Sequence, residues 1–140
     1  MNNLHSDAFV FFGATGDLAY KKIFPSLHAM AKRGTLNVPV IGIAKEDWNL
    51  DRFRARALDS IEKHSGNNGM DRSAFDKLSG LLRYVGGDYG DPATFRAIRQ
   101  ELGASERPAH YLAIPPVLFG PVVEQLSKAG AASSARVFVE

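Results

Sequence analysis

A short turn with a glycine at each end carries the residues best suited to chemistry in this sequence. Gly13-Ala14-Thr15-Gly16 follows an apolar run directly and precedes a segment with helical periodicity. The glycines let the backbone turn sharply and approach a ligand without an intervening side chain. Amide groups of such a turn and of the first helical residues, with the positive end of the helix dipole, bind phosphate. The pattern therefore predicts a nucleotide-phosphate site.

A glycine turn without any ligand is the alternative interpretation. The context favours phosphate binding, because the turn follows the first strand, opens a helix and heads an alternating α/β pattern. Thr15 offers a hydroxyl donor, and Ala19 is small where the helix and the strand must pack closely. Asp17 is expected to cap the first helical turn, although its carboxylate would repel a phosphate.

The segment GIAKEDW (42–48) stands where a dinucleotide-binding domain contacts the adenosine ribose. An acidic residue there accepts the ribose hydroxyls of NAD, whereas a cation pairs with the 2′-phosphate of NADP. Lys45 comes first and favours NADP, and the neighbouring Glu46 weakens that preference. A solvated lysine at the end of a strand is the alternative interpretation of Lys45.

Five short apolar runs alternate with stretches of helical periodicity. Strands are expected at residues 8–12, 39–44, 82–85, 109–114 and 136–139. Helices are expected at 17–33, from the Asn49 cap to just before His64, at 71–81, from the Asp91-Pro92 pair, and at about 117–128. Pro25 should kink the first helix, because it lacks a backbone donor. This order predicts one α/β domain over residues 1–140, with a doubly wound, Rossmann-type parallel sheet.

Composition excludes several classes of function. The absence of cysteine excludes disulfides, thiolate metal sites and cysteine nucleophiles from this sequence. The 17 Lys and Arg are scattered among 15 Asp and Glu, so the charge pattern does not favour a nucleic-acid partner. The longest apolar run, 8–12, is too short to span a membrane. The first seven residues carry no export signal, so we expect a cytoplasmic protein.

No catalytic or metal-binding constellation is visible in the sequence. The histidines at positions 5, 28, 64 and 110 lack metal-ligand spacing, so no metal site is expected. The arginines at positions 52, 54 and 56 are expected on a solvated helix face.

Longer segments around the turn resemble one enzyme family. GATGDLAYKKIFPSL (13–27) is similar to the signature of the glucose-6-phosphate dehydrogenase family, and GIAKEDW resembles its Gly-x-Ala-Arg segment. YVGGDYGD (84–91), YLAIPPVLFG (111–120) and RVFVE (136–140) match further landmarks in the same order, so the resemblance covers essentially the whole chain. It implies oxidation of glucose 6-phosphate at C1 to 6-phosphogluconolactone, with hydride transfer to NADP or, in some members, NAD. It further implies the oxidative pentose phosphate pathway and a homo-oligomer.

The resemblance also implies roles for positions in this chain. Its cofactor-binding residues would be Gly13, Ala14, Thr15, Gly16, Asp17, Leu18, Ala19 and Tyr20 at the turn, Lys45 at the 2′-phosphate, Asp88 and Tyr89 after the third strand, and Ala113, Pro115 and Phe119 at the nicotinamide end. Lys22 matches a family lysine that faces the sugar phosphate, and in bare sequence terms it is equally a surface lysine.

The sequence departs from the family pattern at three places. Lys45 replaces an arginine and loses planar bidentate recognition while keeping the charge. Tyr20 stands where lysine is common, and Phe24 stands where tyrosine is common. The family's Glu-Lys-Pro lysine would follow Glu140, and the Asp-His pair whose histidine takes the C1 hydroxyl proton lies further on. We therefore expect the front portion of a longer protein, with no catalytic residue in this chain and no turnover by it alone.

Three rival classes begin with a similar turn. An extended short-chain dehydrogenase needs a Tyr-x-x-x-Lys pair, and no tyrosine here has a lysine four residues on. Semialdehyde dehydrogenases use a cysteine nucleophile, which is absent. A nucleotide-sensing or inactive Rossmann protein is the remaining alternative.

Overall fold

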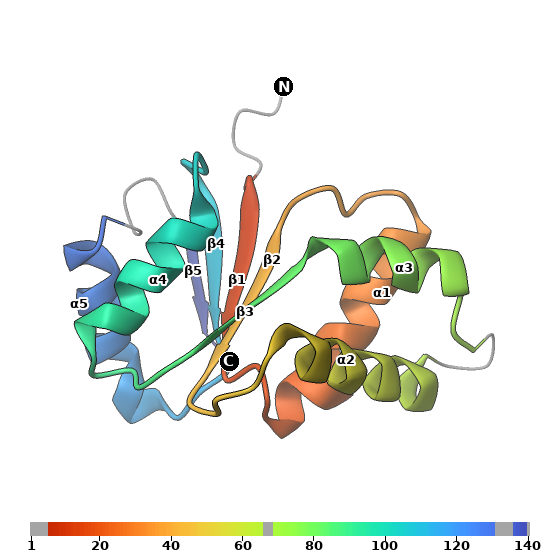
Figure 1. Ribbon diagram of the computed structural model, residues 1–140, viewed down its shortest axis with the longest axis horizontal. Coiled ribbons are helices and arrows are strands. Elements are labelled where there is room, and N and C mark those ends of the chain that lie inside the picture. The colour runs from red at the N-terminus through yellow and green to blue at the C-terminus, as the bar shows by residue number, and fades with distance from the viewer. Residues whose placement is uncertain (1–5, 66–68, 131–135, 140) are drawn as a thin grey trace.

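A five-stranded parallel sheet forms the centre of the computed structural model, which describes residues 6–65, 69–130 and 136–139 (Figure 1). The strands are β1 (Ala8–Phe12), β2 (Val40–Ala44), β3 (Leu82–Gly86), β4 (Pro108–Leu112) and β5 (Arg136–Val139), in the spatial order β3-β2-β1-β4-β5. Every neighbouring pair is parallel. The strand order reverses between β1 and β4, which confirms the predicted doubly wound sheet.

Helices cover both faces of the sheet (Figure 1). One face packs against α1 (Phe24–Lys32), α2 (Leu50–His64) and α3 (Arg72–Leu81), and the other against α4 (Pro92–Leu102) and α5 (Phe119–Lys128). Side chains of β1 alternate between these two cores, with Phe11 in the first and Val10 and Phe12 in the second. Because β1 is covered on both sides, it appears in the sequence as an unbroken apolar run.

Side-chain caps begin α2, α3 and α4 where the sequence predicts them. Asn49 accepts a hydrogen bond from the amide of Arg52 at 2.8 Å, and Asp71 and Asp91 do the same for Ala74 and Ala93. Each cap satisfies a backbone donor that the first helical turn leaves without a partner. Pro92 takes the first helical position after Asp91, as expected. Among the described residues no side-chain hydrogen bond caps the start of the first helix, so the expected cap by Asp17 is wrong.

Several strand and helix boundaries differ from the prediction by one residue or a few. The elements of the first helix, a π-helical segment followed by α1, cover 19–32 rather than 17–33. α3 begins at Arg72 rather than 71, and α2 includes His64, which was expected to follow the helix. β2 begins at Val40 rather than 39, β3 extends to Gly86, and β4 covers 108–112 rather than 109–114. The chain leaves β4 at Ala113, where the backbone carbonyl packs against Gly13. A short 3₁₀ turn (Pro116–Leu118) precedes α5, which therefore begins at Phe119 instead of 117.

The first helix accommodates Pro25 through a π-helical segment, Ala19–Ile23, ahead of α1. The amide of Phe24 donates to the carbonyl of Ala19, one residue further back than in an α-helix. The next carbonyl, that of Tyr20, would in this pattern need the amide of residue 25, which proline lacks. The hydroxyl of Ser60 on α2 donates to the Tyr20 carbonyl instead. Pro25 therefore widens one turn of the helix, and a side chain from α2 supplies the missing donor.

Within the described residues, no helix is long and apolar enough to cross a membrane. The same ranges hold no group of three or more His, Cys, Asp or Glu side chains placed to bind a metal ion. Glu140, which precedes the position expected for the family lysine, lies outside the described residues.

Candidate dinucleotide-binding site

Gly13 fixes the shape of the turn between β1 and the first helix. Its φ of +80° lies in the left-handed region that glycine adopts without strain. A Cβ added at this position would overlap the carbonyl oxygen of Ala113, at the end of β4. Both the backbone angle and the close approach therefore require glycine, and they bring the predicted residues Gly13 and Ala113 together at the switch between β1 and β4.

The turn offers fewer free amides than its sequence suggests. The Gly13 and Ala14 amides both donate to the carbonyl of Ile43, at 2.9 and 3.1 Å, and the Gly16 amide donates to Gly13 at 3.0 Å. Among the described residues, the amides of Thr15, Asp17 and Leu18 have no such partner. These three donors lie at the start of the helix, where an anion is also favoured by the helix dipole. They are therefore the groups that fit a pyrophosphate.

The side chains of the turn have different roles from those of its backbone. Ala14 and Ala19 are fully buried in the core that faces α1, α2 and α3, so neither methyl group faces a ligand. The burial of Ala19 confirms the prediction of close packing between helix and strand. Gly16 and Asp17 are exposed, and a Cβ at Gly16 would meet only the Gly13 carbonyl oxygen, at 3.3 Å. Space for a ligand is thus present beside Gly16.

Thr15 and Glu46 join the turn to the end of β2. The Thr15 hydroxyl donates to Oε1 of Glu46 at 2.7 Å, so this hydroxyl contacts a carboxylate rather than standing free for a phosphate. The hydrogen bond from Thr15, followed by one from the Glu46 backbone, lowers the pKa of the Glu46 carboxyl, and the charges of Lys45 and Arg52 act in the same direction. The side chain of Glu46 is therefore ionised at neutral pH.

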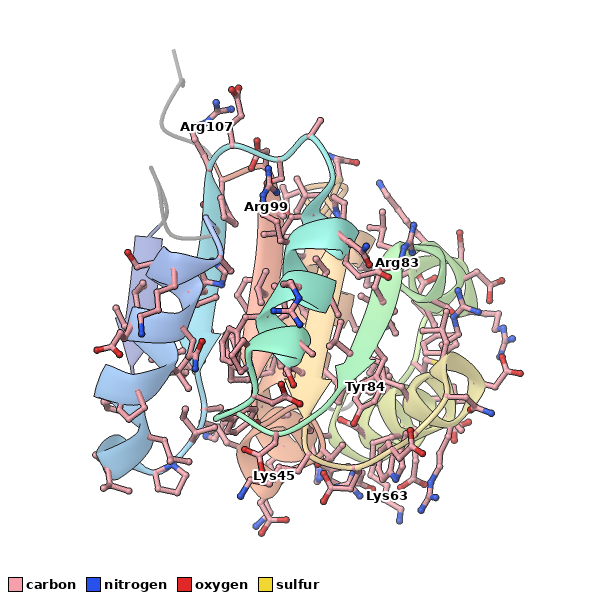
Figure 2. All side chains as sticks on the ribbon, turned by 60° about the vertical axis from the view of Figure 1, so that its left-hand side comes forward. Lys45, Lys63, Arg83, Tyr84, Arg99 and Arg107 are labelled. Carbon is pink, nitrogen blue, oxygen red and sulfur yellow. The ribbon has the colours of Figure 1, made fainter. Side chains whose placement is uncertain are left out.

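The predicted cation Lys45 is exposed at the same end of the sheet as Tyr84 and Lys63, opposite Arg107 (Figure 2). The backbone beside it is held by Tyr84, whose hydroxyl donates to the carbonyl of Glu46 at 2.5 Å. Burial raises the pKa of Tyr84 to about 12. The segment that would contact the adenosine ribose is therefore fixed by β3.

Tyr89, which follows β3, is hydrogen-bonded to the backbone of the glycine turn. Its side chain is 6% exposed, and its hydroxyl accepts a hydrogen bond from the Gly13 amide at 2.9 Å while donating to Ile43 at 3.3 Å. Burial raises the pKa of Tyr89, so the hydroxyl stays protonated. Asp88, the other residue expected at the cofactor after the third strand, is exposed. Its carboxylate accepts a hydrogen bond from the Gly90 amide. Asp88 therefore faces the solvent side, whereas Tyr89 positions the turn.

The end of β4 holds the residues expected at the nicotinamide. Ala113 is half-buried, and its amide donates to Phe12 at 3.1 Å. Pro115 is exposed beyond it, and Phe119 is half-buried where α5 begins, against the core that faces α4 and α5. These residues follow the strand next to β1 at the same edge of the sheet.

Arg56 is a site residue that the sequence reasoning missed. The expected solvated face of α2 is wrong at this position, because the Arg56 side chain is half-buried and its Nη2 donates to the Thr15 carbonyl at 3.1 Å. Its guanidinium lies 4.2 Å from the ring centroid of Tyr20, a cation–π contact. Its Nε is buried without a partner among the described residues. The helical spacing of the arginines gave no signal for this, because the contact joins residues 41 positions apart.

Tyr20 lies in the π-helical segment. Its backbone amide donates to the Gly16 carbonyl of the turn at 3.1 Å, while its side chain contacts α2. Its hydroxyl donates to Asp59, which also pairs with Lys63 at 3.5 Å. The hydrogen bond to Asp59 raises the pKa of Tyr20. The Tyr20 side chain thus links the first helix to α2, through its hydroxyl to Asp59 and through its ring to the Arg56 guanidinium.

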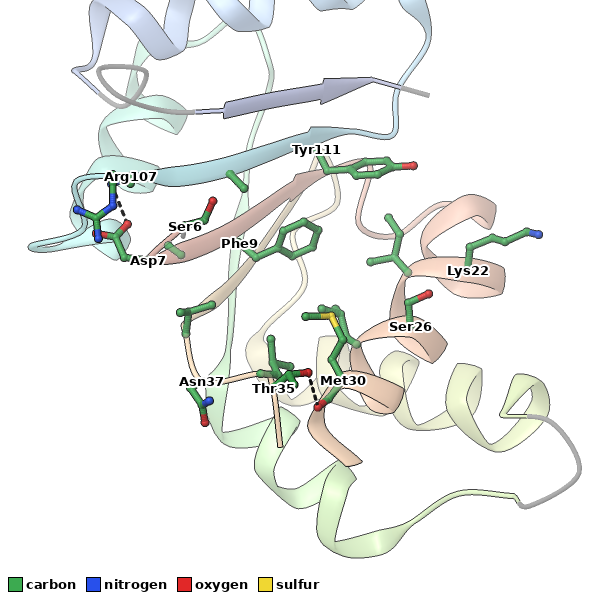
Figure 3. Close-up of a pocket in the computed structure, with 16 residues that line it drawn as sticks. Ser6, Asp7, Phe9, Lys22, Ser26, Met30, Thr35, Asn37, Arg107 and Tyr111 are labelled. Atoms are coloured by element: carbon green, nitrogen blue, oxygen red, sulfur yellow. Dashed lines mark hydrogen bonds between the residues drawn. The ribbon is translucent and has the colours of Figure 1, made fainter. Parts of the chain in front are cut away.

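Lys22 stands apart from the turn, at the edge of a pocket of about 780 Å³. The pocket lies over the α1 side of β1 and β4. Figure 3 shows Phe9, Met30 and Tyr111 around its middle, with Lys22 at one end and Arg107 at the other. Lys22 is exposed there. The structure therefore separates this lysine from the residues that gather at the turn.

The ends of β1, β2, β3 and β4 and the glycine turn define a dinucleotide-binding α/β domain. The sequence model of the family "Glucose-6-phosphate dehydrogenase, NAD binding domain" matches residues 10–140. The chain belongs to this family.

Named relatives agree with that assignment. Glucose-6-phosphate 1-dehydrogenase 1 of Mycobacterium bovis is 36% identical over 135 residues, which are 96% of this chain and 28% of the relative. Glucose-6-phosphate 1-dehydrogenase of Caenorhabditis elegans is 32% identical over 130 residues, 86% of this chain and 24% of the relative. The chain thus spans about a quarter of the length of these proteins.

Solved structures show the same likeness. A crystal structure of glucose-6-phosphate 1-dehydrogenase from Mycobacterium avium superposes with a TM-score of 0.90 and 39% identity, over 96% of this chain and 29% of that one. A glucose-6-phosphate dehydrogenase in complex with glucose-6-phosphate gives a TM-score of 0.77 and 25% identity, over 94% of this chain and 29% of that one. A short-chain dehydrogenase/reductase from Veillonella parvula, at 12% identity and a TM-score of 0.51, shares the fold alone.

Proposed function

We propose that this chain is the cofactor-binding domain of a glucose-6-phosphate 1-dehydrogenase, which oxidises glucose 6-phosphate to 6-phosphogluconolactone. NADP is the proposed hydride acceptor, and NAD is the alternative. The observation that carries the proposal is the turn itself. Gly13 brings the ends of β1 and β4 together, while the free amides of Thr15, Asp17 and Leu18 stand beside the open space at Gly16.

The residues around the turn act by holding it in one shape. Tyr89 and Ile43 fix the Gly13 amide, and Arg56 fixes the Thr15 carbonyl. The three free amides then need little rearrangement to bind the pyrophosphate. When bound, the nicotinamide supplies the hydride acceptor. The proposed place for its ring is beside Ala113 and Pro115, with Phe119 behind them.

Substrate binding and proton transfer belong to the longer polypeptide in this proposal. Lys22 is proposed to face the phosphate of glucose 6-phosphate, which agrees with its exposure at the edge of the pocket. The base that takes the C1 proton would come from outside this chain. We further propose a cytoplasmic, homo-oligomeric enzyme of the oxidative pentose phosphate pathway. The isolated 140-residue chain is then expected to bind NADP weakly and to show no turnover.

A domain exchange tests the proposal. The corresponding domain of the Mycobacterium avium enzyme is replaced by this chain, and the reduction of NADP and NAD with glucose 6-phosphate is followed by absorbance at 340 nm. The proposal expects activity in the chimera and a large loss with Gly16→Val, which fills the space beside the free amides. A folded chimera that binds neither NAD nor NADP would support an inactive Rossmann protein instead. Turnover by the isolated chain would contradict the proposal that the base which accepts the C1 proton lies outside this chain.

A further inference from the structure

The π-helical segment lies between two fixed parts of the first helix. On one side, the Tyr20 amide donates to the Gly16 carbonyl at 3.1 Å, in the pattern of an α-helix, and so ties the segment to the glycine turn. On the other side, Phe24 and Leu27 are buried in the core that faces α1, α2 and α3. The Phe24 amide donates to Ala19, one residue further back than in an α-helix. The segment therefore fits one extra residue between the glycine turn and the buried face of α1.

Lys22 lies within this segment, on a different side of the helix from Tyr20. The Tyr20 hydroxyl donates to Asp59 on α2. Lys22 instead lies at one end of the pocket over β1 and β4, in a row with Ser26 and Met30, which line the same pocket (Figure 3). Residues four positions apart share one face of an α-helix. Lys22 therefore continues the face of α1 that borders the pocket.

The extra residue decides which side chain lies at this end of the pocket. Successive residues of an α-helix point about 100° apart around its axis. Without the extra residue, and with the glycine turn in place, each position at the end of the segment would be taken by the preceding residue. Lys22 would then take the place of Ile23, which is 7% exposed in the core, where a lysine ammonium is strongly disfavoured. The π-helical segment thus keeps Lys22 at the surface.

Ser60 favours the π pattern over the α pattern. Its hydroxyl is fully buried and donates to the Tyr20 carbonyl, for which Pro25 has no amide. In the α pattern the Phe24 amide would serve that carbonyl, and the Ser60 hydroxyl would lose its acceptor. Because a buried polar group without a partner is destabilising, Ser60 holds the extra residue in the segment.

We propose that Ser60 is a positioning residue for Lys22: by binding the Tyr20 carbonyl it maintains the π-helical segment, and this directs the lysine toward the phosphate of glucose 6-phosphate. The inference rests on the proposed function, which supplies the role of the lysine. Ser60 itself is buried and contacts neither substrate nor cofactor. It acts through the backbone of the first helix, on the position of a cation whose attraction for a phosphate depends on distance.

The test uses the chimera of the Mycobacterium avium enzyme that carries this chain. Ser60→Ala is expected to raise the KM for glucose 6-phosphate about fivefold, while kcat and the KM for NADP change by less than about twofold. Ser60→Cys fills the same space with a weaker donor and should raise the same KM about threefold, so the test stands if the alanine variant does not fold. Ser65→Ala is the matched control, because the Ser65 hydroxyl donates to the Ile61 carbonyl, away from the first helix. It should leave every KM within about twofold of wild type.

A double-mutant cycle shows whether Ser60 acts through the lysine. Lys22→Met removes the ammonium and keeps an apolar stem. In this background Ser60→Ala should change the KM for glucose 6-phosphate by less than about twofold, because no cation is left to position. An equal rise in both backgrounds overturns the inference, as does an unchanged KM in both Ser60 variants or an equal rise in the KM for NADP. A chimera whose KM for glucose 6-phosphate is unaffected by Lys22→Met overturns the role of Lys22 in the proposed function, and one that binds neither coenzyme overturns the proposed function itself.

Discussion

The hydroxyl of Ser60 on α2 donates a hydrogen bond to the backbone carbonyl of Tyr20, which Pro25 leaves without a backbone donor. Ser60 is fully buried, so this carbonyl has no access to water through that side. The contact ties the helix that begins at the glycine turn to α2, the helix that also carries Arg56. The hydrogen bond from Ser60 and the one from Arg56 to Thr15 thus both fix α2 against the segment that begins at the glycine turn.

Replacing Ser60 by alanine should destabilise the chain by about 1 to 3 kcal/mol, because a buried carbonyl is left unsatisfied. Urea denaturation would measure the change in the free energy of unfolding. In a Pro25→Ala background, the restored amide at position 25 can serve the Tyr20 carbonyl, so Ser60→Ala should then cost less by at least about 1 kcal/mol. Equal costs in both backgrounds would show that proline does not create the need for Ser60.

Gly13→Ala should destabilise the fold far more than Gly34→Ala. Both glycines have a positive φ, +80° and +78°, but an added Cβ at Gly34 meets nothing within 4 Å, whereas at Gly13 it overlaps the Ala113 carbonyl. Gly34→Ala should cost about 1 kcal/mol for the backbone strain alone. Gly13→Ala should exceed this by about 2 kcal/mol or more, because the ends of β1 and β4 must separate. Thermal and urea unfolding measure both, and similar losses would contradict the close approach.

Arg56→Met should weaken dinucleotide binding about tenfold, the equivalent of about 1.4 kcal/mol. Methionine keeps the apolar stem and loses the hydrogen bond to the Thr15 carbonyl and the contact with Tyr20. Arg54→Met is the control on the same helix, since the Nε of Arg54 donates to the Ser79 carbonyl, away from the turn. Calorimetric titration with NADP distinguishes them. Equal affinities in the two variants would remove Arg56 from the site.

The lowered pKa of Asp7 should make the free energy of unfolding depend on pH. Burial alone would raise the pKa of its carboxyl, but hydrogen bonds from the Ser105 hydroxyl and from the amides of Glu106 and Arg107 outweigh burial and lower the pKa below its ordinary value of 3.8. A depressed pKa in the folded state contributes stability above the unfolded pKa, and this is lost as the pH falls through the folded pKa.

Asp7→Asn should therefore cost about 0.5 to 1 kcal/mol at pH 7, because solvent screens this partly exposed carboxylate, and the difference from wild type should shrink below pH 3.8. Urea denaturation across this pH range provides the measurement. Asp76→Asn is the control, because Asp76 pairs with Arg72 on the exposed face of α3 and should change stability by less than about 0.5 kcal/mol. A cost that stays constant down to pH 2 would contradict the lowered pKa.

Local sequence patterns were sufficient for the fold and for the glycine turn on which the proposed site rests. The apolar runs gave the strands to within a few residues, and Asn49 and Asp91 gave helix starts, because these signals depend on neighbouring residues alone. Gly13 and Gly16 marked the turn for the same reason.

Contacts between distant segments were not predictable in this way. The charged residues around Arg56 predict a solvated helix face, because its hydrogen-bond partner Thr15 is 41 positions away in the sequence. The same holds for Tyr89 beneath Gly13 and for Thr15 with Glu46. The resemblance to the family named Tyr89 as bordering the cofactor, but it could not show that the ring is buried with its hydroxyl on the turn. The π-helical segment likewise depends on Ser60, which follows Pro25 by 35 positions.

We propose above that a nicotinamide dinucleotide binds at the glycine turn. The most direct test is a titration of the ¹⁵N-labelled chain with NADP and with NAD, followed by amide chemical shifts. The largest shifts are expected on the amides of Thr15, Asp17 and Leu18, with smaller shifts at Glu46 and Ala113. Saturable shifts confined to the pocket lined by Phe9, Met30 and Tyr111, or no site-specific shift at the turn at millimolar dinucleotide, would contradict it.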